Sequence, residues 1–371
     1  MLAYLPRLQM LRFAAAGMVL FGHAQHQVRE VPGMDLSNFQ QLGNAAFYAS
    51  GVDVFFVLSG FIMYAIASEQ FGRPQAPSDF MLRRLARIVP PYWAFTSLML
   101  AATVLFANHV NNKQLSLDLV MGSYFFIPTP NAHGDLYPVL ILGWTLNFEM
   151  LFYTIFAIGL RWPRARGLAL IAGVVSFLGL GGLLFEPRSP QLAFWFNPIV
   201  FEFLFGIGLA RVHASGWRGS NTWGVAMLAL GIALLLLGSP YSGASPFWAP
   251  RAFWMGLPAL IICAAAVLTR ETKSFGPISD LLAFAGDTSY LLYLSHPFTL
   301  AVMVSLARRT ALTDPWTFVV MGCLACVGAA ALLHRFVEKP TLARINWRIR
   351  FVLVTRARRM PVMVQAERRA A

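Results

Sequence analysis

The stretch at 45–67 reads AAFYASGVDVFFVLSGFIMYAIA, and Asp53 is its only charged residue. A helix rises about 1.5 Å per residue, so about 20 apolar residues cross a hydrocarbon core of about 30 Å. This stretch is long enough and apolar enough to do so. It therefore predicts a membrane-spanning helix, and with it the class of the protein.

Further blocks of similar length flank this stretch on both sides. The chain of 371 residues is 57% apolar and 12% charged, whereas soluble domains are about one quarter charged. We expect spans at 8–26, 45–67, 89–107, 138–160, 167–185, 194–212, 223–239, 253–269, 281–306 and 316–333. The prediction is an all-α polytopic transmembrane bundle of about ten helices, with a membrane domain at 1–340 and a basic tail at 341–371.

The chain has a net charge of +13, and its basic residues gather in alternate loops between the apolar blocks. With the N-terminus inside, 23 of the 29 basic residues fall in cytoplasmic segments, an excess typical of the inner side of membrane proteins. We therefore expect both termini in the cytoplasm and a multi-pass protein of a bacterial inner membrane. The basic tail predicts contact with anionic membrane lipids and not with nucleic acid.

The last block contains a Cys-x-x-Cys pattern, formed by Cys323 and Cys326. A structural zinc site needs four ligands, and no second cysteine pair or histidine cluster accompanies this pattern. Cysteine in an apolar span behaves as a small apolar side chain, and Cys263 fits the same description. We expect no metal site.

The first block carries two ionisable side chains, Arg12 and His23. Eleven residues at about 100° each bring them to one helix face, about 16 Å apart. His23 suits a general base that takes a proton from a hydroxyl, although an interfacial histidine at a helix end fits equally well. Arg12 alone favours a cytoplasmic anchor.

A polar stripe crosses the fourth block, where residues 144–149 read WTLNFE. Glu149 has no basic residue within four positions, so its carboxyl group must be protonated, paired across helices or facing water, which favours a functional role. We expect Glu149 to orient His23. We also expect Asn147 to donate to the oxyanion of a tetrahedral intermediate, and Tyr153 to lie on the Glu149 face.

Two other segments carry charged residues, and the role of each allows two interpretations. Asp53 in the second block is either a second partner of His23 or a carboxylate at a helix cap or interface. A basic turn at 80–92, which includes Arg84 and Arg87, precedes the third block. It either fixes the membrane topology or binds the phosphates of coenzyme A through its guanidinium groups.

The ninth block contains Ser289 and, seven positions later, His296 followed by Pro297. Proline interrupts helical hydrogen bonding and kinks a helix, so a structural histidine beside a kink is one interpretation of His296. The other places His296 in the same cavity as His23. We expect Ser289 and His296 to contribute to the substrate site.

Taken together, the motifs resemble membrane-bound acyltransferase family 3, and 127–153 is similar to its exopolysaccharide acetyltransferase branch. The resemblance covers nearly the whole chain. The matching blocks are 11–23, 51–61, 83–92, 144–153, 289–297 and 336–340. Each block alone is weak evidence for the family, but six blocks in this order are specific for it.

The resemblance implies acetyl-CoA as a cytoplasmic acyl donor, with no bound cofactor, and a carbohydrate or lipid-linked oligosaccharide as acceptor. It implies that Arg12 and His23 are essential, which favours a catalytic role for His23. The family has serines where Thr145 and Asn147 stand, so a serine-dependent role does not transfer to these positions. Glu149 is retained.

The sequence thus predicts an integral membrane O-acyltransferase that moves an acetyl group to a sugar hydroxyl of an exopolysaccharide or its lipid-linked precursor. We expect His23 and Glu149 to meet in one polar pocket, with the donor phosphates near Arg84 and Arg87. A transporter or flippase of lipid-linked saccharide would use the same buried charges without bond making. A scaffold of a polysaccharide synthase would tolerate their replacement, and association as a homo-oligomer or with polysaccharide synthesis machinery stays open.

Overall fold

The computed structural model describes residues 6–37, 39–105, 115–185, 187–239, 251–270, 277–310, 312–345 and 347. The described residues form helices and no strand, which confirms the all-α class. Six of their helices are long and apolar enough to cross a membrane. The expected count of about ten spans and the cytoplasmic termini stay predictions, and most of the expected tail at 341–371 lies outside the described residues.

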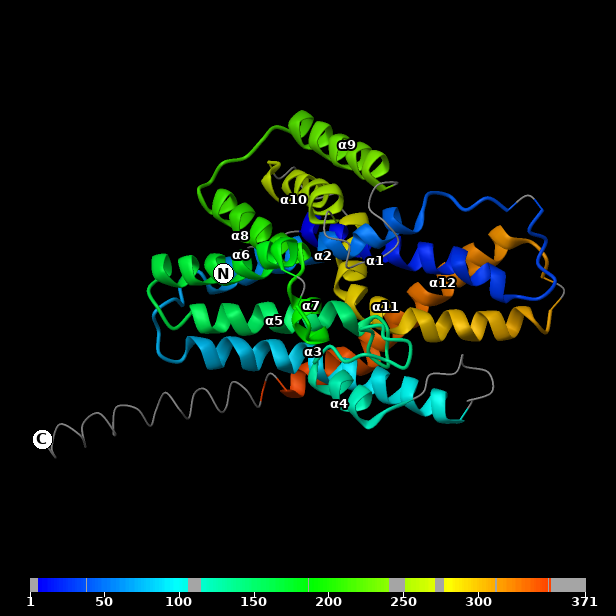
Figure 1. Ribbon diagram of the computed structural model, residues 1–371. Helices are drawn as coiled ribbons and strands as arrows, with labels where there is room; N and C mark the ends of the chain where they lie inside the picture. The colour runs from blue at the N-terminus through cyan, green and yellow to red at the C-terminus, as the bar shows by residue number, and fades with distance from the viewer. Residues whose placement is uncertain are drawn as a thin grey trace, which may run out of the picture.

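The order of elements follows the apolar blocks of the sequence (Figure 1). The second block is confirmed at both ends, because α2 spans Ala45–Ala67. The other helices are α1 Pro6–Gln27, α3 Ala76–Leu105, α4 Leu117–Phe125, α5 Gly143–Gly159, α6 Arg164–Leu184, α7 Pro190–Trp195, α8 Phe201–Ala214, α9 Asn221–Gly238, α10 Leu257–Leu268, α11 Pro277–Ala307 and α12 Pro315–Leu333, with short turns η1 Val28–Glu30, η2 Pro198–Val200, η4 Ala252–Gly256 and η5 His334–Glu338.

The basic segment at 80–92 is helical, so its prediction as a turn is wrong. Helix α3 begins at Ala76 and runs through Pro90 and Pro91 to Leu105. A proline inside a helix removes its own N–H donor and crowds the carbonyl one turn before it, and neighbouring helices in a membrane protein compensate for the lost hydrogen bond. The expected end of this span at 107 lies outside the described residues.

The predicted span at 194–212 is also wrong in its first part. Helix α7 ends at Trp195, and α8 begins only at Phe201. Between them Asn197 accepts the backbone N–H of Ile199 at 2.9 Å and Pro198 starts a separate short turn. A side chain that takes over a backbone donor in this way ends one helix and starts another.

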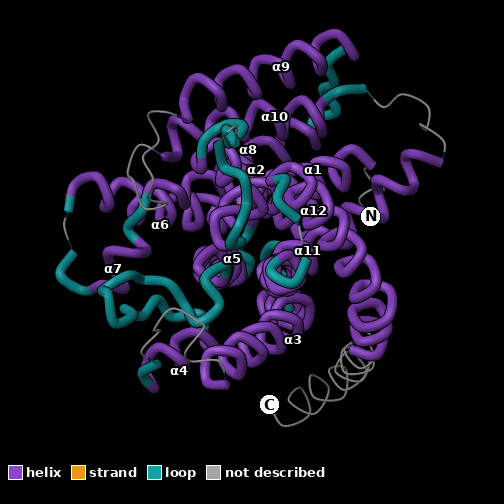
Figure 2. The backbone as a smooth tube through the Cα atoms, turned by 90° about the vertical axis from the view of Figure 1, so that its right-hand side faces the viewer, coloured by secondary structure: helices purple, strands orange, loops and turns teal. Residues whose placement is uncertain are grey.

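The centre of the bundle is built from α1, α2, α5 and α11, as the view along the helices shows (Figure 2). Glycines permit the closest approaches: a Cβ at Gly51 would overlap the carbonyl oxygen of Ala15 on α1, and a Cβ at Gly60 would overlap that of Phe203 on α8. Small residues at membrane helix interfaces allow such contact. Helices α6 and α9 lie on the outside of the bundle with mostly exposed faces (Figure 2).

Candidate active site

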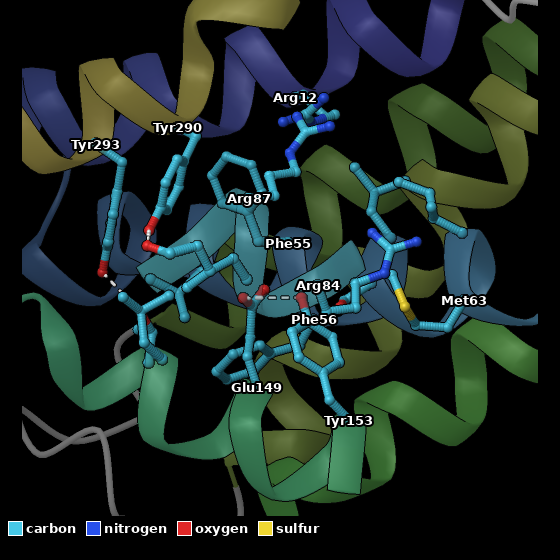
Figure 3. Close-up of a pocket in the computed structure, with 17 residues that line it drawn as sticks. Arg12, Phe55, Phe56, Met63, Arg84, Arg87, Glu149, Tyr153, Tyr290 and Tyr293 are labelled. Carbon is cyan, nitrogen blue, oxygen red and sulfur yellow. Dashed lines mark hydrogen bonds between the residues drawn. The ribbon is translucent and has the colours of Figure 1, made fainter. Parts of the chain in front are cut away.

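Two adjoining cavities lie between the central helices. The first, here called the arginine cavity, has a volume of about 130 Å³ and receives side chains from α1, α2, α3, α5 and α11. Figure 3 shows Glu149 pointing from α5 into this cavity, which Arg12, Arg84 and Arg87 also line. Its other polar lining residues are Ser59, Thr145, Tyr153, Tyr290 and Tyr293.

Hydrogen bonds fix the walls of the arginine cavity. The hydroxyl of Tyr153 donates to Glu149 Oε2 at 3.1 Å, which places the two residues on one face of α5, as predicted. The hydroxyl of Tyr290 donates to the carbonyl oxygen of Ile88 at 2.9 Å, so α11 is tied to α3 next to the basic segment. Arg12 donates to Gln9 Oε1 at 3.0 Å on its own helix.

The arginine cavity has an excess of positive charge. Three guanidinium groups and one carboxylate, Glu149, line it. Within the part of the chain that the structure describes, none of these arginines lies within 4 Å of a carboxylate oxygen, and the buried Nε of Arg84 has no hydrogen-bond partner. Buried charges require partners, so the arrangement suits a ligand that brings negative charge into the cavity.

The second cavity, here called the histidine cavity, has a volume of about 380 Å³. His23 lines it from α1, together with Asn44, Tyr137 and Arg251. His23 Nδ1 lies 2.8 Å from Nε2 of His296 on α11. His296 is completely buried, and its Nδ1 lies 3.0 Å from the carbonyl oxygen of Leu292.

The two cavities share two lining residues, Val52 on α2 and Tyr293 on α11. The Tyr293 hydroxyl lies 3.2 Å from Thr145 Oγ1 and donates to the carbonyl oxygen of Leu142 at 3.3 Å. These contacts join α11 to the start of α5. The arginine cavity and the histidine cavity therefore adjoin at Val52 and Tyr293.

The single pocket that was predicted for His23 and Glu149 is wrong, because each residue lines a different cavity. His296, and not Glu149, contacts the His23 imidazole. The reason lies in α1 itself, because Arg12 and His23 are about 16 Å apart along the helix and cannot both line one small cavity. No pattern in the sequence indicates which end of α1 lies near Glu149, and in the structure Glu149 lines the same cavity as Arg12.

Asp53 takes part in a buried ion pair with Arg251. Arg251 Nη2 lies 2.6 Å from Asp53 Oδ2, its Nε donates to Oδ1 at 3.0 Å, and Nη2 also donates to the carbonyl oxygen of Ala49 at 3.1 Å. Asp53 thus has the interface role, and its alternative as a second partner of His23 is not realised. Sequence reasoning missed Arg251, which directly precedes η4 and carried no motif.

Asn147 and Ser289 are buried away from the lining of both cavities. Asn147 Oδ1 and Ser289 Oγ have no hydrogen-bond partner in the described part of the chain. Two residues along a helix correspond to about 200°, so Asn147 points away from the face of Glu149. Neither side chain lines a cavity in this arrangement, and the oxyanion role of Asn147 and the substrate contact of Ser289 stay predictions.

Comparison with known proteins decides the class of chemistry. Residues 5–335 match the family described as an acyltransferase domain. The chain belongs to the acyltransferase-3 family. With six helices able to cross a membrane, it is a multi-pass membrane acyltransferase, as its sequence motifs predicted.

Among the relatives of this acyltransferase, one is named for exopolysaccharide production and one for O-acetyl transfer. The chain is 34% identical to the exopolysaccharide production protein ExoZ of Rhizobium meliloti, over 80% of this chain and 90% of ExoZ. It is 24% identical to the "Putative peptidoglycan O-acetyltransferase YrhL" of Bacillus subtilis, over 86% and 56%, and 25% identical to nodulation protein 10 of Rhizobium leguminosarum bv. viciae, over 90% and 92%. No solved structure matches the chain.

Proposed function

We propose that this acyltransferase moves an acetyl group from acetyl-CoA to a hydroxyl of an exopolysaccharide or of its lipid-linked precursor, in a bacterial inner membrane. The name of ExoZ supports an exopolysaccharide, and the name of YrhL supports O-acetylation. The observation that carries the proposal is the pair of adjoining cavities, one with excess positive charge and one lined by His23.

The arginine cavity is the donor side of the proposed site. Guanidinium groups bind phosphate oxygens bidentately, and coenzyme A carries several phosphates. In the proposal, Arg84 and Arg87 hold these phosphates, and Arg12 lines the same cavity from α1. The positive-inside pattern of the sequence favours the cytoplasmic face for this end of α1, where acetyl-CoA is available.

The histidine cavity is the acceptor side. His23 takes the proton of the sugar hydroxyl, and the resulting oxygen attacks the thioester carbon. The new oxygen–carbon bond forms, the carbon–sulfur bond breaks, and the proton passes from His23 to the sulfur of coenzyme A. Since Tyr293 and Val52 line both cavities, the acetyl end of the donor passes these side chains on its way to His23.

The test uses the purified full-length protein in liposomes with labelled acetyl-CoA and exopolysaccharide, or its lipid-linked precursor, from the source bacterium. We expect release of coenzyme A and transfer of label to saccharide. Movement of saccharide across the membrane without either product would support a transporter or flippase and overturn the proposal.

A histidine variant pair tests the catalytic group. We expect His23→Ala to lower the transfer rate by about 100-fold or more, the usual contribution of a general base, while the protein still inserts in the membrane. His133→Ala serves as the matched control because His133 is exposed in a loop outside both cavities. Full activity of His23→Ala would remove His23 from the catalytic role.

A further inference from the structure

A chain of three hydrogen-bonding groups ends at His23. The carbonyl oxygen of Leu292 lies 3.0 Å from His296 Nδ1, and His296 Nε2 lies 2.8 Å from His23 Nδ1. A carbonyl oxygen only accepts, so His296 Nδ1 must carry the hydrogen and donate to Leu292. The first link of the chain therefore fixes the hydrogen of His296.

The second link fixes the hydrogen of His23. His296 is completely buried, and no ion pair with a carboxylate exists for it among the described residues, so its imidazole is neutral and carries one hydrogen. Its Nε2 is then an acceptor, and His23 Nδ1 must be the donor. One hydrogen on Nδ1 leaves Nε2 of a neutral His23 with a free lone pair.

We infer that His296 is a positioning residue, which holds His23 in the tautomer whose Nε2 is the base for the acceptor hydroxyl. The inference rests on the proposed function. His23 lines the histidine cavity, whereas His296 is buried behind it. His23 Nδ1 is occupied by His296, so Nε2 is the nitrogen left for a hydroxyl in the cavity.

The contact also stabilises the product of proton transfer. When Nε2 of His23 takes the acceptor proton, the ring becomes positively charged and its Nδ1–H bond to His296 becomes charge-assisted, which roughly doubles the strength of such a bond. In the Ser-His-Asp triad a carboxylate orients and stabilises the histidine in this way. Here a neutral imidazole does so, backed by a helix carbonyl.

The local structure of α11 holds His296 in place. Pro297 lies inside α11 and has no N–H, so one backbone hydrogen bond of the helix is missing at this turn. From α12, the thiol of Cys326 contacts the carbonyl oxygen of His296 at 3.8 Å. From the sequence alone, one interpretation of His296 was a structural histidine beside a proline kink. In the structure both ring nitrogens of His296 have hydrogen-bond partners, and a kink requires neither of these bonds.

Two amide substitutions separate the positioning role from a structural one. His296→Gln places an amide oxygen near the former Nε2 and keeps the acceptor for His23. His296→Asn has a shorter side chain, which can still donate to the carbonyl oxygen of Leu292 but does not reach His23. We expect His296→Asn to lower kcat by about 10- to 100-fold, in the range for residues that orient a catalytic histidine, with KM for acetyl-CoA unchanged. We expect His296→Gln to retain most of kcat.

The opposite order would overturn the inference, because a residue that only bonds the helix carbonyl is replaced better by asparagine. Equal loss in both variants with a raised KM would also overturn it. Ser295→Ala is the matched control: Ser295 is buried on the same turn, and its hydroxyl has no hydrogen-bond partner in the described residues. Its removal should leave kcat unchanged.

A second measurement does not depend on activity. Nitrogen chemical shifts of ¹⁵N-histidine-labelled protein in bilayers report which ring nitrogen carries the hydrogen. We expect hydrogen on Nδ1 and none on Nε2 for both His23 and His296, assigned with the His23→Ala and His296→Asn variants. A His23 with hydrogen on Nε2 refutes the positioning role, even where the protein transfers acetyl, and hydrogen on Nδ1 supports it even where the proposed transfer fails.

Discussion

At the scale of single residues, a charged side chain without a partner nearby in the sequence indicates the candidate site better than a motif does. Glu149 was singled out from its isolation in the sequence, and it lies in a cavity with three arginines. Asp53 is equally isolated in its own stretch, yet it is matched by Arg251 from a distant part of the chain. A buried ion needs a partner of opposite charge in both cases. Only the contacts between helices show whether that partner is another side chain of the protein.

Arg84 is predicted to bind the donor. Its guanidinium group lies 5.6 Å from the centroid of the Phe80 ring and its buried Nε is unpaired in the described structure. We expect Arg84→Ala to raise KM for acetyl-CoA by about 10-fold or more, because a hydrogen bond to a charged group contributes about 1.5–3 kcal/mol. Steady-state kinetics with varied acetyl-CoA measures this change.

Arg83 supplies the matched control for Arg84. It is the preceding residue on α3, lies exposed and outside the arginine cavity, and donates to Gln70 Oε1 at 3.4 Å. We expect Arg83→Ala to leave KM for acetyl-CoA unchanged. Equal effects of the two substitutions would show that general surface charge, and not the cavity, attracts the donor.

Asp53 is predicted to stabilise the fold through its pair with Arg251, without itself taking part in transfer. Asp53→Ala leaves the Arg251 guanidinium buried without this carboxylate, which costs about 3–5 kcal/mol for comparable buried pairs. We expect a lower temperature of thermal unfolding in detergent, partly restored in the Asp53→Ala, Arg251→Met double variant. An inactive Asp53→Ala protein of unchanged stability would instead place Asp53 in the reaction.

At the scale of helices, small residues set how closely the elements approach. A Cβ at Gly206 on α8 would overlap the carbonyl oxygen of Val57 on α2, and Gly60 on α2 has the reciprocal relation to Phe203. The partner helix of α2 at Gly60 is therefore α8. This contact holds α2 in the centre, where it presents Val52 to both cavities.

Gly206 is therefore expected to tolerate no side chain. We expect Gly206→Ala to destabilise the protein by about 1–3 kcal/mol, the usual cost of overpacking, measured as a lower unfolding temperature. Gly208→Ala is the control on the same helix, since a Cβ there meets nothing within 4 Å. Its stability should be equal or slightly higher, because alanine favours a helix by up to about 1 kcal/mol over glycine. Similar destabilisation by both would contradict the close contact of α2 and α8.

The sequence predicts helices well because apolar length is a local property. Both ends of α2 follow from the stretch at 45–67. It fails where local hydrogen bonding competes with hydropathy, as at Asn197, and where proline continues a helix, as at Pro90. The faces of α5 could have been predicted, because the spacing of Asn147 and Glu149 already excludes a shared face.

At the scale of the whole molecule, the site depends on how α1, α5 and α11 are brought together. The sequence predicted the Arg12 and His23 face of α1, but no local pattern tells that Glu149 joins the Arg12 end or that His296 meets His23. These pairings are separated by more than 100 positions in the chain. The division into an arginine cavity and a histidine cavity is therefore a result of tertiary structure.

The most direct test of the account is transfer across a sealed membrane. The protein is inserted in liposomes with its termini outside, labelled acetyl-CoA is added outside, and exopolysaccharide from the source bacterium is enclosed inside. We expect free coenzyme A outside and acetyl label on the enclosed saccharide, both lost in His23→Ala. Saccharide that stays unlabelled while acetyl-CoA remains intact on the outside would contradict transfer between the two cavities.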